Sequence, residues 1–268
     1  MARSPGLAVL TIALACTGIA GCADEDPETG VITLGVAAAP SLSAAFTEII
    51  EVFEAEHPDV RVSIELGRSD DIAEGLASRT DINVFASAGE HAMDIAVAAG
   101  AAVNPEIFAR NNVVLAVPSG NPKRIASLRD LERNDIRVGL CEVNVPCGRA
   151  ASSLLNAAGV DPGDVERVVG FRALASQLAD NHLDVGIVYS TDVASSHGWV
   201  VKADVDEVER ELEQAAGTTS YHLARVTSGA DGANADAETA ASEEFIQLVL
   251  SSRGRQALRN SGLDAMAE

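Results

Sequence analysis

The chain has 268 residues, enough to bury a sizeable core or to form two lobes of ordinary domain size. Its formal net charge of -21 excludes nucleic acid as a partner, because phosphate backbones are bound by basic surfaces, and it makes an anionic membrane surface an equally poor docking site. Hydrophobic residues make up 47% of the chain and aromatic residues only 3%, which suits an α/β protein built on small aliphatic side chains.

The first residues have the pattern of a secretion signal. A basic residue precedes a short apolar run at residues 7–15, which is too short to span a bilayer. The box Ile19-Ala20-Gly21-Cys22 resembles a bacterial lipoprotein signal, and this implies cleavage before Cys22 and attachment of lipid to it. Removing residues 1–21 deletes one arginine and no acid, which takes the net charge from -21 to -22. Residues 22–29 then form an acidic tether.

The stretch from Val31 to Phe53 predicts a strand that enters a helix through a tight turn. Val31–Val36 is apolar and rich in β-branched residues, and apolar residues recur at helical spacing from Leu42 onward. The start of such a helix points free N–H groups and the positive end of its dipole at the turn, so Ser41 can help to hold an anion. Alternatively, Ser41 or Ser43 caps the helix.

The same order of strand and helix continues along the chain. Ser69 lies where the strand at 60–66 passes into a helical run, as Ser41 does in the first unit. Strands that alternate with helices imply βαβ units and parallel sheets, with ligands at the carboxyl ends of the strands. Further strands are predicted at 83–87, 113–117, 136–140, 165–169, 185–189 and 221–226, and further helices at 90–99, 149–158, 171–179, from 190, and within 245–258. We expect 204–214 to be a charged, solvated helical face and 227–240 to be a loop.

The four cysteines have different expected roles. Cys16 leaves with the signal and Cys22 takes lipid, which leaves Cys141 and Cys147 as a disulfide in an oxidising compartment. The five histidines lie singly without ligand spacing, so we expect no metal site and no cofactor. Five residues separate Cys141 from Cys147, unlike the two of a redox Cys-x-x-Cys motif, which argues against a thiol oxidoreductase.

Several segments in order resemble the molybdate-binding (ModA-type) subunit of bacterial ABC importers. The resemblance covers most of the chain from about Ile32 to Gly262. It implies an α/β, two-lobed periplasmic-binding-protein-like fold (type II), in which each lobe is a mixed, mostly parallel sheet flanked by helices and the ligand lies in the interlobe cleft. Lobe 1 would comprise residues 30–117 and 220–268, and lobe 2 residues 118–219. The segments are AAAPSLSAAF (37–46), NVFASAGEHAMD (83–94), FARNNVVLAVPSGNP (108–122), VPCG (145–148), GIVYSTD (186–192) and FIQLVLSSRGRQAL (245–258).

The resemblance also implies the residues that hold an oxyanion. The hydroxyls of Ser41, Ser69 and Tyr189 and the main-chain amides of Cys147 and Phe171 fall on the family's binding positions. The chain departs from the family pattern at Arg68, Asn83, Gly89, the Tyr221-His222 pair and Phe171 itself. We expect Arg68 to pair with an acid outside the cleft, and Asp70 and Asp71 to face solvent in the first turn of a helix.

The implied function is capture of molybdate or tungstate by a monomeric, lipid-anchored receptor on the outer face of the cytoplasmic membrane, which passes the anion to an ABC permease. Such dianions only accept hydrogen bonds, so a site made of donors suits them. Another tetrahedral oxyanion, such as sulfate or phosphate, or a sensory role of the same fold remain as alternatives. A serine hydrolase is disfavoured, since the sequence has no Gly-x-Ser-x-Gly elbow and no histidine predicted near Ser41 or Ser69.

Overall fold

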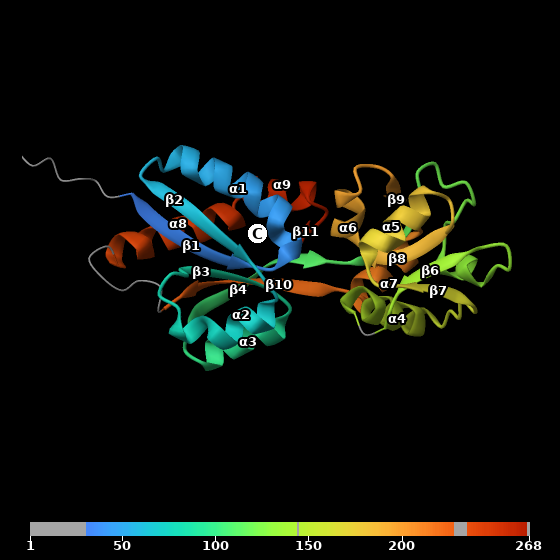
Figure 1. Cartoon of the computed structure of the whole chain (residues 1–268), viewed down its shortest axis with the longest axis horizontal. Helices are drawn as coiled ribbons and strands as arrows, with labels where there is room; N and C mark the ends of the chain where they lie inside the picture. The colour runs from blue at the N-terminus through green and yellow to red at the C-terminus, as the bar shows by residue number, and fades with distance from the viewer. Residues whose placement is uncertain (1–30, 144, 228–234, 267–268) are drawn as a thin grey trace, which may run out of the picture. The chain divides into compact units, whose positions relative to one another are not determined.

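The computed structural model describes residues 31–143, 145–227 and 235–266 (Figure 1). The predicted signal peptide, the lipidated Cys22 and the acidic tether lie outside the described residues. None of the helices in the described ranges is long and apolar enough to cross a bilayer.

The first of two sheets is mixed and has the strand order β11-β4-β10-β3-β1-β2. The strand β1 pairs in parallel with β2 and β3, whereas β10 runs antiparallel to β3 and β4. The strands are β1 (Ile32–Ala38), β2 (Val60–Leu66), β3 (Val84–Ala88), β4 (Ala102–Asn111), β10 (Thr219–Val226) and β11 (Asp264–Ala265). The accompanying helices are η1 (Pro40–Leu42), α1 (Ser43–Glu56), α2 (Ser69–Gly75), η2 (Leu76–Ser78), α3 (Glu90–Ala98), α8 (Ala235–Leu250) and α9 (Ser252–Asn260).

Alternating side chains of β1 supply two cores, one on each face of the first sheet. Leu34 and Val36 pack with the phenylalanines of α1 and α8, whereas Ala37 joins a cluster with η2 and α3. Figure 1 accordingly shows α1 and α8 on one face of this sheet and α2 and α3 on the other. Because both faces are covered there, β1 and β3 are mostly buried, whereas the edge strand β2 alternates apolar and polar residues and is mostly exposed.

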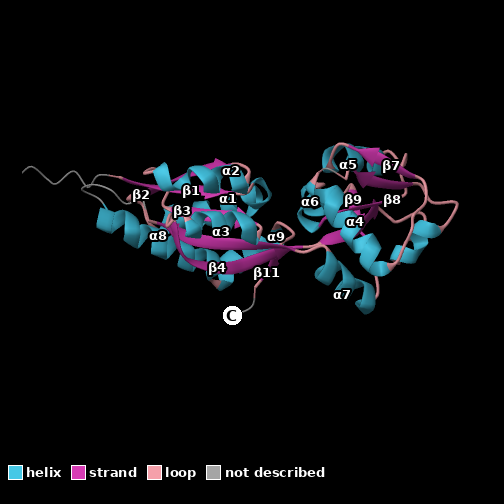
Figure 2. Ribbon diagram, turned by 90° about the horizontal axis from the view of Figure 1, so that it is seen from below, coloured by secondary structure: helices cyan, strands magenta, loops and turns pink. Residues whose placement is uncertain are grey.

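The second sheet is also mixed and has the order β7-β6-β8-β5-β9. The strand β6 pairs in parallel with β7 and β8, and β5 runs antiparallel to β8 and β9. Helices lie on both sides of these strands (Figure 2). The strands are β5 (Val113–Pro118), β6 (Val138–Cys141), β7 (Val165–Val168), β8 (Val185–Tyr189) and β9 (Val200–Lys202). The helices are η3 (Leu128–Glu132), α4 (Pro146–Ala158), α5 (Phe171–Ala179), α6 (Ser190–Ser195) and α7 (Glu207–Ala216).

The chain passes from the first sheet to the second at Asn112, between β4 and β5, and returns between α7 and β10. The sequence-based boundary at Val117 differs from this crossing, because β5 pairs with β8 and β9 of the second sheet. Asn112 is followed at once by the apolar run of β5, so neither a turn signal nor a change in composition marks the crossing.

Three sequence-based expectations for single elements were wrong. The strand β4 is absent from the predicted elements because Pro105 and scattered polar residues hide its periodicity. The expected loop at 227–240 gives way to α8 at Ala235. Residues 204–214 are more than solvated surface, since α7 packs against the second sheet and Glu213 is only 6% exposed.

Candidate functional site

Two of the predicted site residues follow neighbouring parallel strands of the first sheet. Ala38 ends β1 opposite Leu66, which ends β2, so Ser41 and Ser69 lie at the same edge of the sheet. The C-terminal end of β3 lies beside them, because Ala88 donates its backbone N–H to the Ser69 hydroxyl oxygen at 2.9 Å. The sequence thus brings both serines to the edge where parallel sheets bind ligands.

The Ser69 hydroxyl is arranged as a donor. Its side chain is 8% exposed and its oxygen already accepts a hydrogen bond from Ala88. No acceptor for its own proton occurs among the described residues. Since a buried hydroxyl is strongly favoured to use its proton, Ser69 is suited to donate to an anion at this edge.

The Ser41 hydroxyl belongs to a chain of polar side chains that reaches the second sheet. Its oxygen lies 2.6 Å from the hydroxyl of Tyr221, which receives a hydrogen bond from the Asn111 amide at 3.3 Å. We assign the Tyr221 proton to Ser41, because a phenol oxygen that accepts from Asn111 can donate onward; the Ser41 proton is then available to a ligand.

Asn111 anchors this chain at the crossing between the sheets. Its side chain is 2% exposed, donates to Thr191 Oγ1 at 2.9 Å and accepts from Ser190 Oγ at 3.0 Å. Ser190 and Thr191 begin α6 directly after Tyr189, so the network links Ser41 to the end of β8. Burial raises the pKa of Tyr221, and its hydrogen bonds with Ser41 and Asn111 oppose that shift, so this hydroxyl keeps its proton near neutral pH.

The other three predicted residues lie at the carboxyl ends of the parallel strands of the second sheet. Cys147 is in the first turn of α4 after β6, Phe171 is the first residue of α5 after β7, and Tyr189 ends β8. First-turn amides such as those of Cys147 and Phe171 have no acceptor within their own helix. The Tyr189 hydroxyl lies 3.4 Å from Thr219 Oγ1 of β10.

The five residues therefore gather as two sets, one at each sheet. Among the described residues, no hydrogen bond joins one of the five to another, and the connection runs through the side chains of Tyr221, Asn111 and Thr191. Sequence reasoning missed Tyr221 and Asn111 as site residues. The available signal was the pair of adjacent asparagines in the FARNNVVLAV segment, at the end of one strand and the start of the next.

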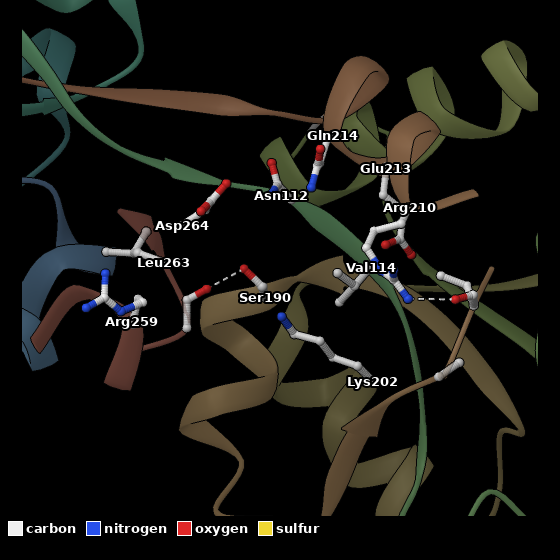
Figure 3. A pocket seen from close by; sticks show the side chains of 13 residues that line it. Asn112, Val114, Ser190, Lys202, Arg210, Glu213, Gln214, Arg259, Leu263 and Asp264 are labelled. Carbon is white, nitrogen blue, oxygen red and sulfur yellow. Dashed lines mark hydrogen bonds between the residues drawn. The ribbon is translucent and has the colours of Figure 1, made fainter. Parts of the chain in front are cut away.

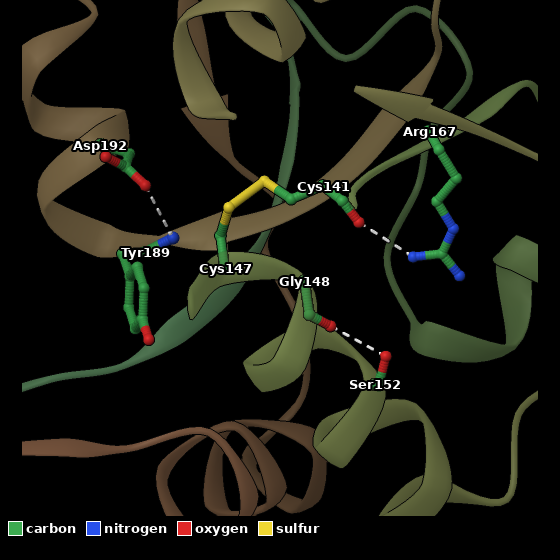
Figure 4. The surroundings of a disulfide bond; sticks show 7 residues. All are labelled: Cys141, Cys147, Gly148, Ser152, Arg167, Tyr189 and Asp192. Atoms are coloured by element: carbon green, nitrogen blue, oxygen red, sulfur yellow. Dashed lines mark hydrogen bonds between the residues drawn. A yellow bond between two sulfur atoms is a disulfide. The ribbon is translucent and has the colours of Figure 1, made fainter. Parts of the chain in front are cut away.

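The disulfide predicted between Cys141 and Cys147 is present in the structure, and it ties the end of β6 to the first turn of α4 (Figure 4). Both cysteines are buried, and Cys141 O accepts a hydrogen bond from Arg167 at 3.0 Å. Gly148 permits this tight turn, because a Cβ there would lie 2.0 Å from the carbonyl oxygen of Glu142. The bridge thus fixes the backbone that carries the Cys147 amide.

Replacing Cys141 and Cys147 together by serine should lower the free energy of unfolding by about 2 kcal/mol, because the bridge closes a short loop. Urea denaturation of the two proteins measures the difference. A loss near zero would show that the loop is fixed without the bridge, and Ser152→Ala in the same helix serves as a control outside the ring.

The charged residues near these turns lie mostly as expected from the sequence. Arg68 pairs with Asp71 across 3.4 Å, and both side chains are largely exposed. Asp70 and Asp71 lie in the first turn of α2, with Asp71 exposed and Asp70 half-buried. Asp192 was not among the site residues predicted from the sequence. Burial raises its pKa to about 6, while the hydrogen bond from Tyr189 N acts in the opposite direction (Figure 4).

The remaining departures from the family pattern have local structural explanations. Asn83 accepts from Gly35 N at 2.8 Å, where β1 runs so close to Asp81 that Gly35 has no room for a side chain. Gly89 precedes α3 with φ +95°, a conformation that favours glycine. His222 is buried beside Ser220, and this burial lowers its pKa.

Two sheets joined by two crossings, with hydroxyl and amide donors collected at their strand ends, define a solute-binding protein. The bacterial extracellular solute-binding protein family matches residues 34–264. The molybdate-binding protein ModA of Mycobacterium tuberculosis is 30% identical over 261 residues, which cover 94% of this chain and 95% of that protein. The chain belongs to the bacterial extracellular solute-binding protein family as a ModA-type member.

Solved structures have the same fold at lower identity. A substrate-binding domain from Clostridium difficile superposes with a TM-score of 0.74 at 18% identity, covering 88% of this chain and 100% of that chain. The periplasmic molybdate-binding protein of Azotobacter vinelandii gives a TM-score of 0.62 at 17% identity, covering 88% and 99%.

Proposed function

We propose that this protein captures molybdate, or tungstate, in a cleft between the two sheets and presents it to an ABC permease. The observation that carries the proposal is the Ser69 hydroxyl, which accepts a hydrogen bond from Ala88 N and so has a proton to give. The assignment of the Tyr221 proton to Ser41 gives Ser41 the same role. A fully deprotonated tetrahedral dianion can only accept hydrogen bonds, which matches such a site. The similarity to ModA proteins supports the same ligand.

The proposed site takes its donors from both sheets. Ser41 and Ser69 would bind from the first sheet, and the amides of Cys147 and Phe171 with the hydroxyl of Tyr189 from the second. We propose that the two sheets are the centres of two lobes, with the hinge at Asn112 and at residues 217–218, and that the lobes close over the anion without catalysis. Each charge-assisted hydrogen bond contributes about 1.5 to 3 kcal/mol, so several are needed to offset the lost hydration of a dianion.

We also propose a location for the protein. The box that ends at Cys22 supports lipid attachment after cleavage, which would hold a monomer at the outer face of the cytoplasmic membrane near its permease. Treating cells with labelled palmitate and comparing the wild type with Cys22→Ala tests this, and label on the variant would contradict it.

Titration calorimetry with molybdate, tungstate, sulfate and phosphate tests the ligand. We expect molybdate and tungstate to bind more tightly than sulfate, because their longer metal–oxygen bonds reach donors spaced for a larger anion, and phosphate to bind weakly because its proton finds no acceptor. A preference for sulfate or phosphate would contradict the proposed ligand but not the assignment of the protein as an oxyanion receptor.

Association should become faster as salt is added. The protein has a net charge of -21, so it repels a dianion at long range, and ions shorten that repulsion to about 10 Å at 0.1 M salt. Stopped-flow measurement of molybdate association across a salt series checks this. An on-rate that falls with salt would mean that a local positive field governs entry.

A further inference from the structure

A cavity of about 350 Å³ lies apart from the predicted oxyanion residues, and none of those five residues lines it (Figure 3). One side of the cavity comes from β9 and α7 of the second sheet, and the other from α9, β11 and the turn between them. The two sides touch where Ser190 donates to Gly262 O at 2.6 Å. Its size is at the lower end of the range for small-molecule pockets.

Three basic side chains from three elements face this cavity: Lys202 of β9, Arg210 of α7 and Arg259 of α9. Within the described ranges, none of the three forms an ion pair with a carboxylate. Arg210 donates to Val205 O and Arg259 to the Gln256 side chain, and both acceptors are neutral. The chain has 40 acids and 19 bases, so three bases around one space that form no ion pair with a described carboxylate are unexpected.

The same lining also carries two acids. The buried Glu213 carboxylate accepts a hydrogen bond from Leu115 N at 3.2 Å, and Asp264 lies on β11. Burial lowers the pKa of Lys202, while the attraction of Glu213 and Asp264 acts in the opposite direction. The three bases of the lining outnumber these two acids.

We propose that this cavity is a second binding site, which takes a small dicarboxylate anion with one carboxylate at Lys202 and the other at Arg259. Bases on opposite walls suit an anion with two separated charges. The apolar side chains of Val114, Val205 and Leu263 in the lining suit the carbon chain between the charges. The cavity shares none of the five proposed oxyanion residues, and its assignment to a dicarboxylate does not rest on the proposed function.

Fumarate is the probe, because it is small, rigid and doubly ionised from about pH 6 to about pH 8. Calorimetric titration of the full chain should show fumarate binding that persists when molybdate is present in saturating amount. Absence of fumarate binding, or its displacement by molybdate, would overturn the second site. Molybdate binding alone, measured in the same protein, decides the proposed function independently.

The chain offers a matched pair of variants, because its only two lysines are Lys202 and Lys123. Lys202→Met should weaken fumarate binding by roughly tenfold or more, as should Arg259→Gln. Lys123→Met, which removes a pair with Asp135 on another part of the second lobe, should leave it unchanged. Equal effects of the two lysine variants would show binding to general surface charge only and would refute the site.

Protonation of Glu213 gives a further test. The charged groups that act on Glu213 or line the cavity with it are Lys202 on β9, Glu209 and Arg210 on its own helix, Arg259 on α9 and Asp264 on β11. Its helix also carries Glu207 and Glu211. When Glu213 is protonated, its negative charge no longer repels the fumarate dianion. Fumarate affinity of the wild type should therefore increase as the pH is lowered from about 8 to about 6, and it should change less in Glu213→Gln. The same pH response in both proteins would contradict the assignment of the anion to this cavity.

Discussion

Replacing Ser69 by alanine is expected to weaken molybdate binding by roughly tenfold to a hundredfold, and Ser41→Ala by a similar factor, since each removes one charge-assisted hydrogen bond. Ser69 receives its hydrogen bond from Ala88 N, so its proton points away from the strand and toward the proposed ligand. The double variant should lose nearly the product of the two factors. Titration calorimetry at fixed salt measures all three.

Tyr221→Phe distinguishes a positioned donor from a merely polar surface. In the assigned network, Tyr221 donates to Ser41 and does not touch the ligand, so the phenylalanine variant frees Ser41 to rotate and weakens binding less than Ser41→Ala does. Tyr189→Phe, which removes the other tyrosine hydroxyl of the chain, should remove a direct contact. If Ser41→Ala, Ser69→Ala and Tyr189→Phe all bind molybdate as the wild type does, the site is wrongly placed, although the family assignment still holds.

Loss of affinity must be separated from loss of fold. Ser69→Ala leaves the buried Ala88 N–H without its acceptor, which costs about 1 to 3 kcal/mol of stability. Ser152→Ala, which removes a hydroxyl bonded to Gly148 O within α4, is a control with a similar local change and no proposed ligand contact. A Ser69 variant that melts cooperatively yet binds weakly would place the effect at the site.

Local patterns predicted the strand-to-helix turns, because these turns depend on apolar runs, small residues and helix starts that lie close together in the sequence. Ser41, Ser69 and Tyr189 each stand at such a turn. The polar network could not be predicted from the sequence, because its partners are far apart in the chain. Tyr221 contacts Ser41 at a sequence separation of 180 residues, and Asn111 contacts Thr191 at a separation of 80. Such contacts follow from strand order in the sheets, which a single sequence does not reveal.

The error at α7 has the same origin. By composition, DVDEVERELEQ is a charged segment, and nothing in it distinguishes Glu213 from the exposed acids around it. Only the packing of α7 against β5 buries Glu213 and supplies Leu115 N as its partner. Arg210 and the other acids of the segment remain at least partly exposed.

Glu213→Gln should stabilise the protein at alkaline pH and leave it unchanged at acidic pH. Burial raises the pKa of Glu213 to about 7, against the hydrogen bond from Leu115 N and the attraction of Lys202. An acid whose pKa is higher in the folded state binds its proton more tightly there, so the wild type loses stability as the pH rises from about 4.5 to about 7. The glutamine keeps an oxygen for Leu115 N and never ionises, so above about pH 7 it should be more stable by about 3 kcal/mol.

Urea denaturation of both proteins at about pH 5 and about pH 8 measures this difference. Asp192, whose pKa burial raises to about 6, changes stability in the same direction, but it is present in both proteins and cancels in the comparison. Glu211→Gln is the matched control, because that residue is exposed on the same helix and should show no gain that depends on pH. An equal gain in stability for Glu213→Gln at both pH values would contradict this prediction. The difference in stability between the two proteins would then come from the packing of the side chain and not from ionisation of the Glu213 carboxylate.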